Sequence, residues 1–224
     1  MTRALEIAER GRFTTKPNPV VGCLIVKGSE VIAEGWHERA GDAHAEVNAL
    51  QAAGEAARDA QAIVTLEPCS HIGRTGPCVE ALISAGIVRV AAAMQDPNPA
   101  VAGRGFQRLR DAGMEVVIGI EGKRAAALNP GFIRRMQTGR PRVRVKLAAS
   151  MDGRTAASDG SSQWISSEAS REDVHRLRAG SCAVVTGMGT VKADNPRLNA
   201  RLTEPIVQPL RVIIDSTGQL STKA

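Results

Sequence analysis

The chain has 224 residues, of which 43% are hydrophobic and 23% charged, as is typical of a globular protein with a sizeable core. It contains no apolar run of the ~18 residues that span a bilayer, so we expect a soluble, cytoplasmic protein with no membrane partner. The net charge of +6 comes from bases interleaved with acids, and only 2% of residues are aromatic, which argues against nucleic acid and fits a small phosphorylated substrate better.

Hydrophobic periodicity predicts an α/β domain over residues 1–140. The predicted elements are a short first helix ending at Gly11, strands at 20–27 and 31–36, a helix at 44–57, a strand at 61–66, a helix at 77–85, a strand at 87–94, a helix at 104–112, a strand at 114–120 and a helix at 121–137. The first two strands are expected to form a hairpin. Helices that alternate with the later strands predict a central sheet covered on both faces.

The helical pattern stops at "TGRPRV", which places a domain boundary near residue 140. The second segment, 141–224, predicts a strand at 142–149, a Gly/Ser loop at 150–163, a helix at 167–179 and strands at 182–187 and 210–215. These elements are too few for an independent core, so we expect an incomplete domain. Because its apolar strands would be exposed, we also expect a homo-oligomer.

The four cysteines divide into two kinds. Cys23 and Cys182 lie in apolar, strand-like runs and are expected to be small core residues. Cys69 and Cys78 lie in a polar loop rich in proline and glycine. A disulfide framework is not expected in a chain without a signal peptide, so the second pair needs another role.

The stretch "HAEVNAL" adds an imidazole and a carboxylate to this pair. His44, Cys69 and Cys78 supply one nitrogen and two sulfurs, which zinc prefers, and leave a fourth tetrahedral position open for catalysis. Zinc makes hydroxide available near neutral pH, and Glu46 is expected to carry protons. Residues two apart on a helix point ~200° away from each other, so His44 must sit at the helix entry, with Asp42 as the expected N-cap.

Other zinc arrangements remain open. A structural zinc needs a fourth protein ligand, for which Cys23 is the nearest candidate, although its strand context argues against it. His37 and His71 are alternative ligands.

"HAE", "EPC" and the second cysteine resemble the zinc-dependent cytidine and nucleotide deaminase superfamily, whose usual spacing between the two cysteines is C-x-x-C. Here residues 70–77 separate them, and the insert "SHIGRTG" is similar to that of the bifunctional riboflavin-biosynthesis family (RibD-like proteins). "TTKPNPVVGCLIV" and "MQDPNPAVAGRG" carry the same resemblance, which extends nearly end to end. It implies a cytidine-deaminase-like three-layer α/β/α domain, 1–140, followed by part of a dihydrofolate-reductase-like α/β domain, 141–224.

The first domain of this family hydrolytically deaminates 2,5-diamino-6-(5-phosphoribosylamino)pyrimidin-4(3H)-one. The resemblance therefore implies zinc at His44, Cys69 and Cys78, with Glu46 taking a proton from water and returning one to the leaving ammonia. It also implies substrate contacts from Asn18, His71 and Arg74, of which the arginine suits the phosphate.

The second domain of the family reduces the ribosyl chain to ribityl with NADPH. "KLAASMDGRTA", "SQWIS", "LRAG" and "GTVKADNPRLNAR" resemble it. The resemblance implies an NADPH side formed by Ala148, Trp164, Thr190, Asp194 and Ser216, and a substrate side formed by Ser162, Arg178, Leu198 and Arg201. Such reductases continue past "IIDSTGQL", so we expect deamination and regard reduction by these 224 residues alone as doubtful.

The leading interpretation is thus a zinc pyrimidine deaminase of riboflavin biosynthesis. One alternative is a nucleic-acid base deaminase, for which a basic groove and aromatic side chains are expected. The other is a non-catalytic zinc module.

Overall fold

The computed structural model describes residues 1–71, 76–99 and 101–221. The chain forms two compact units, Met1–Arg142 and Val143–Ala224. Among the described residues, no helix is long and apolar enough to cross a membrane.

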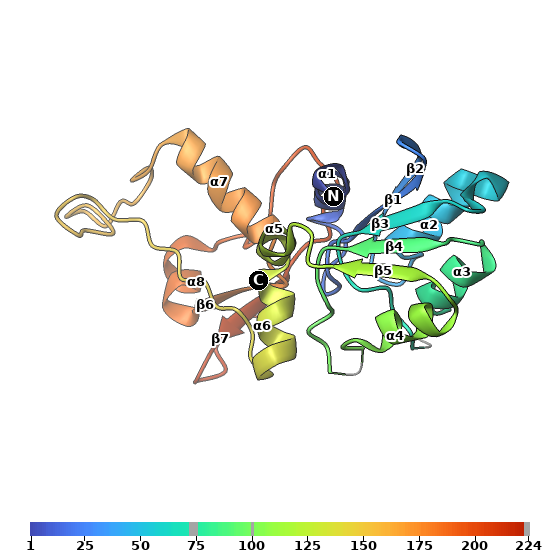
Figure 1. The fold of residues 1–224 in the computed structure, drawn as a ribbon. Helices are drawn as coiled ribbons and strands as arrows, with labels where there is room; N and C mark the ends of the chain where they lie inside the picture. Colours follow the sequence, from blue (N-terminus) through green and yellow to red (C-terminus); the bar gives the residue numbers. More distant parts are fainter. Residues whose placement is uncertain (72–75, 100, 222–224) are drawn as a thin grey trace. The chain divides into compact units, whose positions relative to one another are not determined.

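A five-stranded sheet forms the centre of the first unit, with strand order β2-β1-β3-β4-β5 (Figure 1). The strands are β1 (Gly22–Lys27), β2 (Glu30–Trp36), β3 (Gln61–Val64), β4 (Arg89–Ala92) and β5 (Glu115–Ile118). β1 is antiparallel to both β2 and β3, while β3, β4 and β5 run parallel. The predicted hairpin and all five predicted strands of this unit are confirmed.

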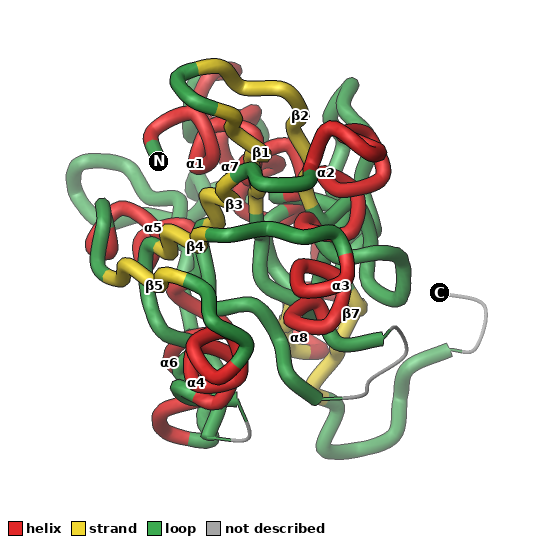
Figure 2. The backbone as a smooth tube through the Cα atoms, turned by 45° about the vertical axis from the view of Figure 1, so that its right-hand side comes forward, coloured by secondary structure: helices red, strands yellow, loops and turns green. Residues whose placement is uncertain are grey.

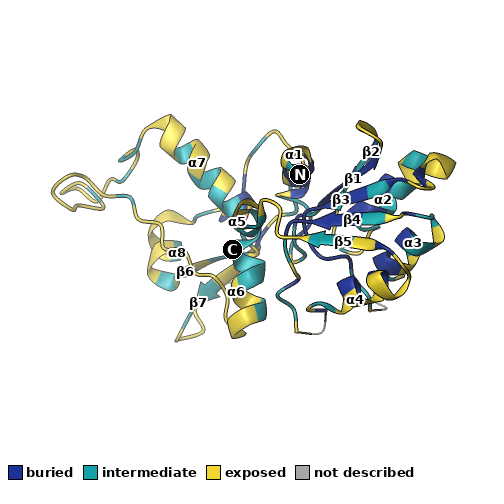
Figure 3. Cartoon of the chain, in the orientation of Figure 1, coloured by how far each residue is buried: buried dark blue, intermediate teal, exposed yellow. Residues whose placement is uncertain are grey.

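Helices cover both faces of this sheet (Figure 2). On β1, Cys23 and Ile25 belong to the larger core cluster, whereas Leu24 and Val26 pack on the opposite face. The larger cluster lies under α2 (Ala45–Ala53), α3 (Cys78–Ser84) and α4 (Arg104–Asp111). The other face is covered by α1 (Thr2–Ala8) and α5 (Gly122–Leu128). Because both faces are buried, β1 is apolar almost throughout, and the three-layer α/β/α expectation is confirmed (Figure 3).

Two predicted helices are interrupted in the structure. The expected helix at 121–137 is two helices, α5 and α6 (Pro130–Thr138), because Pro130 has no N–H to continue the first one. Asn129 stabilises the break, since its side chain accepts from Val20 N at 2.8 Å and donates to Val20 O at 2.9 Å. The expected helix at 44–57 changes at Gly54, where φ is +55°, into a 3-10 turn over Gly54–Ala57.

The second unit contains α7 (Glu168–Ala179), β6 (Ala183–Gly187), α8 (Met188–Asp194) and β7 (Leu210–Ile214). β6 and β7 form a two-stranded parallel sheet, so the predicted helix and the last two predicted strands are confirmed, whereas α8 was not predicted.

The expected strand at 142–149 is wrong, because within the described residues this segment pairs with no strand. Val143, Val145 and Leu147 are 77%, 78% and 81% exposed, so their alternation has no sheet to pack on. Cys182 is exposed rather than buried, which corrects a second expectation and reflects the thin two-stranded sheet beside it.

A close approach between β2 and α2 generates a stability prediction. A Cβ at Gly35 would collide with backbone atoms of Ala45 and Ala49. We expect Gly35→Ala to lower the free energy of unfolding by about 1–3 kcal/mol through overpacking, measured by denaturant titration. Gly131→Ala is the control, because a Cβ there meets nothing within 4 Å. Equal stability of the two variants would contradict this packing.

Candidate metal centre and its pocket

Three ligand-type side chains converge from separate elements of the first unit. His44 is the N-cap of α2, Cys69 follows β3, and Cys78 is the first residue of α3. His44 has extended backbone angles, φ −75° and ψ 164°, and α2 begins at the next residue, Ala45. The prediction that His44 sits at the helix entry is confirmed. The expectation of Asp42 as N-cap is wrong, because His44 itself holds that position.

The distances among these side chains suit a single metal ion. His44 Nδ1 lies 3.2 Å from Cys78 Sγ and 3.5 Å from Cys69 Sγ, and the three ligand atoms all lie within 4.8 Å of one another. Zn–S and Zn–N bonds of ~2.3 and ~2.0 Å at tetrahedral angles require ligand atoms roughly 3.5–3.8 Å apart. One nitrogen and two sulfurs at this spacing therefore fit zinc, and no other such group of three occurs among residues 1–71, 76–99 and 101–221.

The surroundings favour the thiolate form of Cys69. Hydrogen bonds from Cys78 and His44 lower the pKa of Cys69 to about 4. The Cys78 backbone N–H, at the start of α3, donates to the same sulfur at 3.4 Å. The Cys78 pKa is raised, because its proton is held between the two sulfurs. A lowered Cys69 pKa favours the deprotonated form that a metal requires.

Glu46 lies on the first turn of α2 and is only 3% exposed. Burial, followed by the negative charge of Cys69, raises the pKa of this carboxyl to about 7. A carboxyl that holds and releases a proton near neutral pH is suited to general acid–base chemistry.

A pocket of about 470 Å³ opens beside this cluster and is large enough for a small molecule. His44, Glu46 and Cys69 line this pocket together with Asn18 and His71. The structure therefore brings together the deaminase-side residues named from the sequence, except Arg74, which lies outside the described residues.

His37, also in the pocket wall, has a role that sequence reasoning missed. Its ring is 3% exposed, its Nδ1 lies 3.0 Å from Ala43 O, and its Nε2 lies 3.1 Å from Asn18 Nδ2. Burial lowers the His37 pKa, so the neutral ring donates to the carbonyl and accepts from the amide. Since both nitrogens are engaged, His37 orients Asn18 instead of joining the ligand cluster. Its position at the end of β2 was the available signal.

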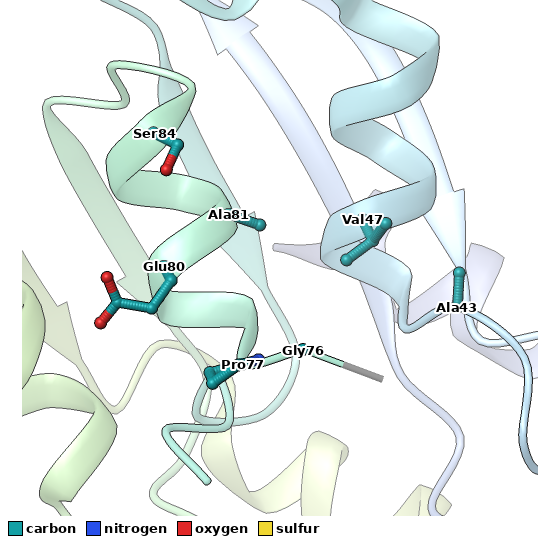
Figure 4. A pocket seen from close by; sticks show the side chains of 7 residues that line it. All are labelled: Ala43, Val47, Gly76, Pro77, Glu80, Ala81 and Ser84. Atoms are coloured by element: carbon teal, nitrogen blue, oxygen red, sulfur yellow. The ribbon is translucent and has the colours of Figure 1, made fainter. Parts of the chain in front are cut away.

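A second hollow lies between α2 and α3 (Figure 4). It has a volume of about 320 Å³ and is lined mainly by small or apolar groups such as Ala43, Val47 and Ala81. Glu80, its charged lining residue, is paired with Arg108 at 2.8 Å. This hollow offers no chemistry comparable to the pocket beside His44.

In the second unit, the residues expected on the cofactor side fall into two groups. Thr190 and Asp194 lie on α8, which follows β6, and Ser216 lies just after β7. Because β6 and β7 run parallel, these three residues lie at the same edge of the sheet. "TGMGT" is the end of β6 and the start of α8. Trp164 is 69% exposed and stacks with the Arg171 guanidinium at 4.4 Å, and Ala148 lies in the irregular 142–149 segment.

The expected reductase substrate side is partly assembled. Arg178 donates to Asn199 O at 3.3 Å, and Arg201 donates to Asn199 Oδ1 at 2.8 Å. Leu198, buried with φ +53°, belongs to the same turn. Ser162 is half-buried in the loop before α7. Desolvation and the nearby Arg201 charge lower the Arg178 pKa, as expected where two cations share a site.

Comparison with known proteins agrees with this geometry. Residues 1–94 match the cytidine and deoxycytidylate deaminase zinc-binding region, and residues 141–224 match the RibD C-terminal domain. The riboflavin biosynthesis protein RibD of Escherichia coli K12 is 54% identical over 99% of this chain. The chain is similar to RibD proteins along nearly its whole length. It spans 64% of that RibD protein's length.

Solved RibD structures share the fold. Acinetobacter baumannii RibD is 53% identical with a TM-score of 0.94, over 98% of this chain and 63% of its own. A Thermotoga maritima diaminohydroxyphosphoribosylaminopyrimidine deaminase/5-amino-6-(5-phosphoribosylamino)uracil reductase is 42% identical with a TM-score of 0.91, over 100% of this chain and 64% of its own. These matches confirm the RibD-like fold class of both segments.

The ligand cluster predicts a specific pattern of metal binding. We expect one zinc per chain, lost in His44→Ala, Cys69→Ala and Cys78→Ala because each removes one of only three protein ligands. His37→Ala and Cys23→Ala should keep the metal. Metal analysis after dialysis measures this, and loss of zinc from the Cys23 variant would instead indicate a closed structural site.

Proposed function

We propose that the unit Met1–Arg142 is a zinc-dependent hydrolytic deaminase of riboflavin biosynthesis that acts on 2,5-diamino-6-(5-phosphoribosylamino)pyrimidin-4(3H)-one. The observation that carries this proposal is a cluster of one imidazole and two thiols beside a buried carboxyl at the base of a pocket. Three protein ligands favour catalysis, since a structural zinc takes four. The names of the RibD relatives support the choice of substrate.

His44, Cys69 and Cys78 would hold the zinc, which when bound supplies Lewis-acid activation of water. Glu46 takes a proton from the attacking water as the new C–O bond forms at the amino-bearing ring carbon. The same carboxyl returns a proton to the departing nitrogen, the C–N bond breaks, and ammonia leaves a carbonyl behind. The burial of Glu46 keeps bulk water from competing for this proton.

The pocket wall orients the ring. Asn18, held by His37, would bind the polar edge of the pyrimidine, and His71 lines the same pocket as an exposed residue. By resemblance Arg74 joins His71 at the phosphate, for which a guanidinium is well suited.

The second unit contributes to an NADPH-dependent reductase in the same proposal. Ala148, Trp164, Thr190, Asp194 and Ser216 form the cofactor side, and Ser162, Arg178, Leu198 and Arg201 the substrate side. Support comes from the shared sheet edge of Thr190, Asp194 and Ser216 and from the hydrogen bonds that Arg178 and Arg201 both donate to Asn199.

We also propose a cytoplasmic homo-oligomer. Free thiol ligands at Cys69 and Cys78 suit a reducing compartment. The exposed apolar side chains of Val143, Val145 and Leu147 favour burial against another surface.

Replacing the proton carrier tests the deaminase proposal. Glu46→Gln keeps the side-chain volume but removes the exchangeable proton, so we expect kcat to fall by about 10²–10⁴-fold while zinc content and unfolding midpoint stay near wild type. Ammonia release from the diaminopyrimidinone phosphate measures turnover. Zinc-loaded wild-type protein that releases no ammonia, or a variant that retains full turnover, would reject the proposal.

The base-deaminase alternative gives a different result. Because only 2% of the residues are aromatic, few rings are available to stack on bases, and we expect weak RNA binding without a steep salt dependence. Filter binding between low and physiological salt measures the slope. A steep slope together with deamination of a polynucleotide would favour the alternative.

A further inference from the structure

A buried carboxylate, Glu67, lies two residues before the ligand Cys69 and is only 3% exposed. Its two oxygens accept four backbone N–H groups. Oε2 accepts from Asp96 at 3.1 Å and from Gly103 at 2.9 Å. Oε1 accepts from Gly105 at 2.9 Å and from Phe106 at 3.4 Å. Charge-assisted bonds of this kind are stronger than neutral ones, so this carboxylate is a major constraint on the backbone around it.

These bonds organise the segment between β4 and α4. Because the N–H groups of Asp96 and Gly103 donate to the same oxygen, Glu67 holds these two residues at a single point. The other oxygen meets the first-turn amides of α4, whose N-cap residue, Gly103, has no side chain for this purpose. Glu67 therefore caps α4 from a different element of the fold.

The fastened segment forms part of the pocket wall. Asp96 and Asn98 line the pocket beside His44 and Cys69, and Asp96 Oδ1 accepts from Asn98 N at 2.8 Å. The wall and the metal ligand are thus joined through one side chain and the short stretch Glu67–Pro68–Cys69, in which Pro68 is fully buried.

The start of α4 also packs closely against Glu67 and Pro68. A Cβ at Gly105 would collide with Pro68 O and would lie 3.1 Å from Glu67 Oε1. The start of α4 therefore rests directly on the peptide that leads into Cys69. Because close-packed atoms leave little room to adjust, we expect a shift of the Glu67 carboxylate to reach the start of α4 and, through Pro68, Cys69.

We propose that Glu67 is a positioning residue that fixes Cys69 and the Asp96–Asn98 wall relative to each other, so that both metal retention and substrate affinity depend on it. The part that concerns substrate rests on the proposed deaminase function, whereas the part that concerns metal and backbone does not. A carboxylate with a merely structural role would change only the stability of the unit.

The test compares Glu67→Gln with Thr65→Val. Glutamine keeps the volume but has one acceptor oxygen, and its NH₂ faces backbone donors. Thr65 is a matched control, because it is also buried at the end of β3 and accepts one backbone N–H, from Gly22 at 3.1 Å, on the side of β1. Loss of its hydroxyl lowers stability without touching the 96–106 segment.

Three measurements separate the roles. For Glu67→Gln we expect zinc transfer to a chromogenic chelator and amide exchange at Asp96, Gly103, Gly105 and Phe106 to be about 10- to 100-fold faster than in wild type, and KM to rise within the same range. Thr65→Val should leave zinc transfer, amide exchange and KM near their wild-type values, although its unfolding midpoint falls to one comparable with that of Glu67→Gln. Glu67→Asp, which keeps the charge but retracts it by one methylene, should give intermediate values and replaces the glutamine variant if that variant does not fold.

The two proposals fail in different ways. Zinc release and exchange that are unchanged in the Glu67 variants, or equally changed in Thr65→Val, would overturn the positioning role. Faster zinc release and exchange in a protein whose wild type deaminates nothing would keep that role and reject the proposed function.

Discussion

The first unit depends on the meeting of one imidazole nitrogen and two sulfurs at the N-terminal ends of two helices. His44 precedes α2 and Cys78 begins α3, so the partial positive charge of both helix ends falls on the thiolate-bearing cluster. Three elements that are distant in sequence must be packed correctly before these atoms come within 4.8 Å. Two close contacts position the ligand-bearing segments. α2 packs on β2 at Gly35, and α4 packs at Gly105 on Pro68, the residue before Cys69.

The ionisable side chains around that cluster differ in the groups that surround them in the buried interior. Donors on two sides lower the pKa of Cys69, and burial raises the pKa of the neighbouring Glu46 to about 7. Glu67, equally buried, meets four backbone donors instead. Two carboxyls of one pocket thus have separate tasks, because one faces the reactive centre and the other faces the backbone.

Periodicity in the sequence predicts the first unit well, because its strands and helices bury continuous apolar surfaces. Periodicity fails where a single residue, or the absence of a pairing strand, determines the secondary structure. Pro130 divides a pattern that otherwise predicts one helix. The alternation at 142–149 predicts a strand, but a strand forms only when another supplies its hydrogen bonds, and within the described residues none does. Cys182 has a core-like sequence context beside a sheet too thin to bury it.

Some features of the candidate site can likewise be predicted from the sequence, and others cannot. The angular argument for His44 and Glu46 needs only local geometry, so the sequence suffices for it. Asn18, which His37 orients, lies 19 residues from it, and the backbone partners of Glu67 lie 29–39 residues away, so no periodicity connects them. X-ray absorption of the zinc-loaded wild-type protein tests the central claim most directly. We predict two sulfurs at ~2.3 Å and two lighter nitrogen or oxygen atoms at ~2.0–2.1 Å, one of them from exchangeable solvent. Three or four sulfurs, or four protein ligands with no solvent atom, would contradict it.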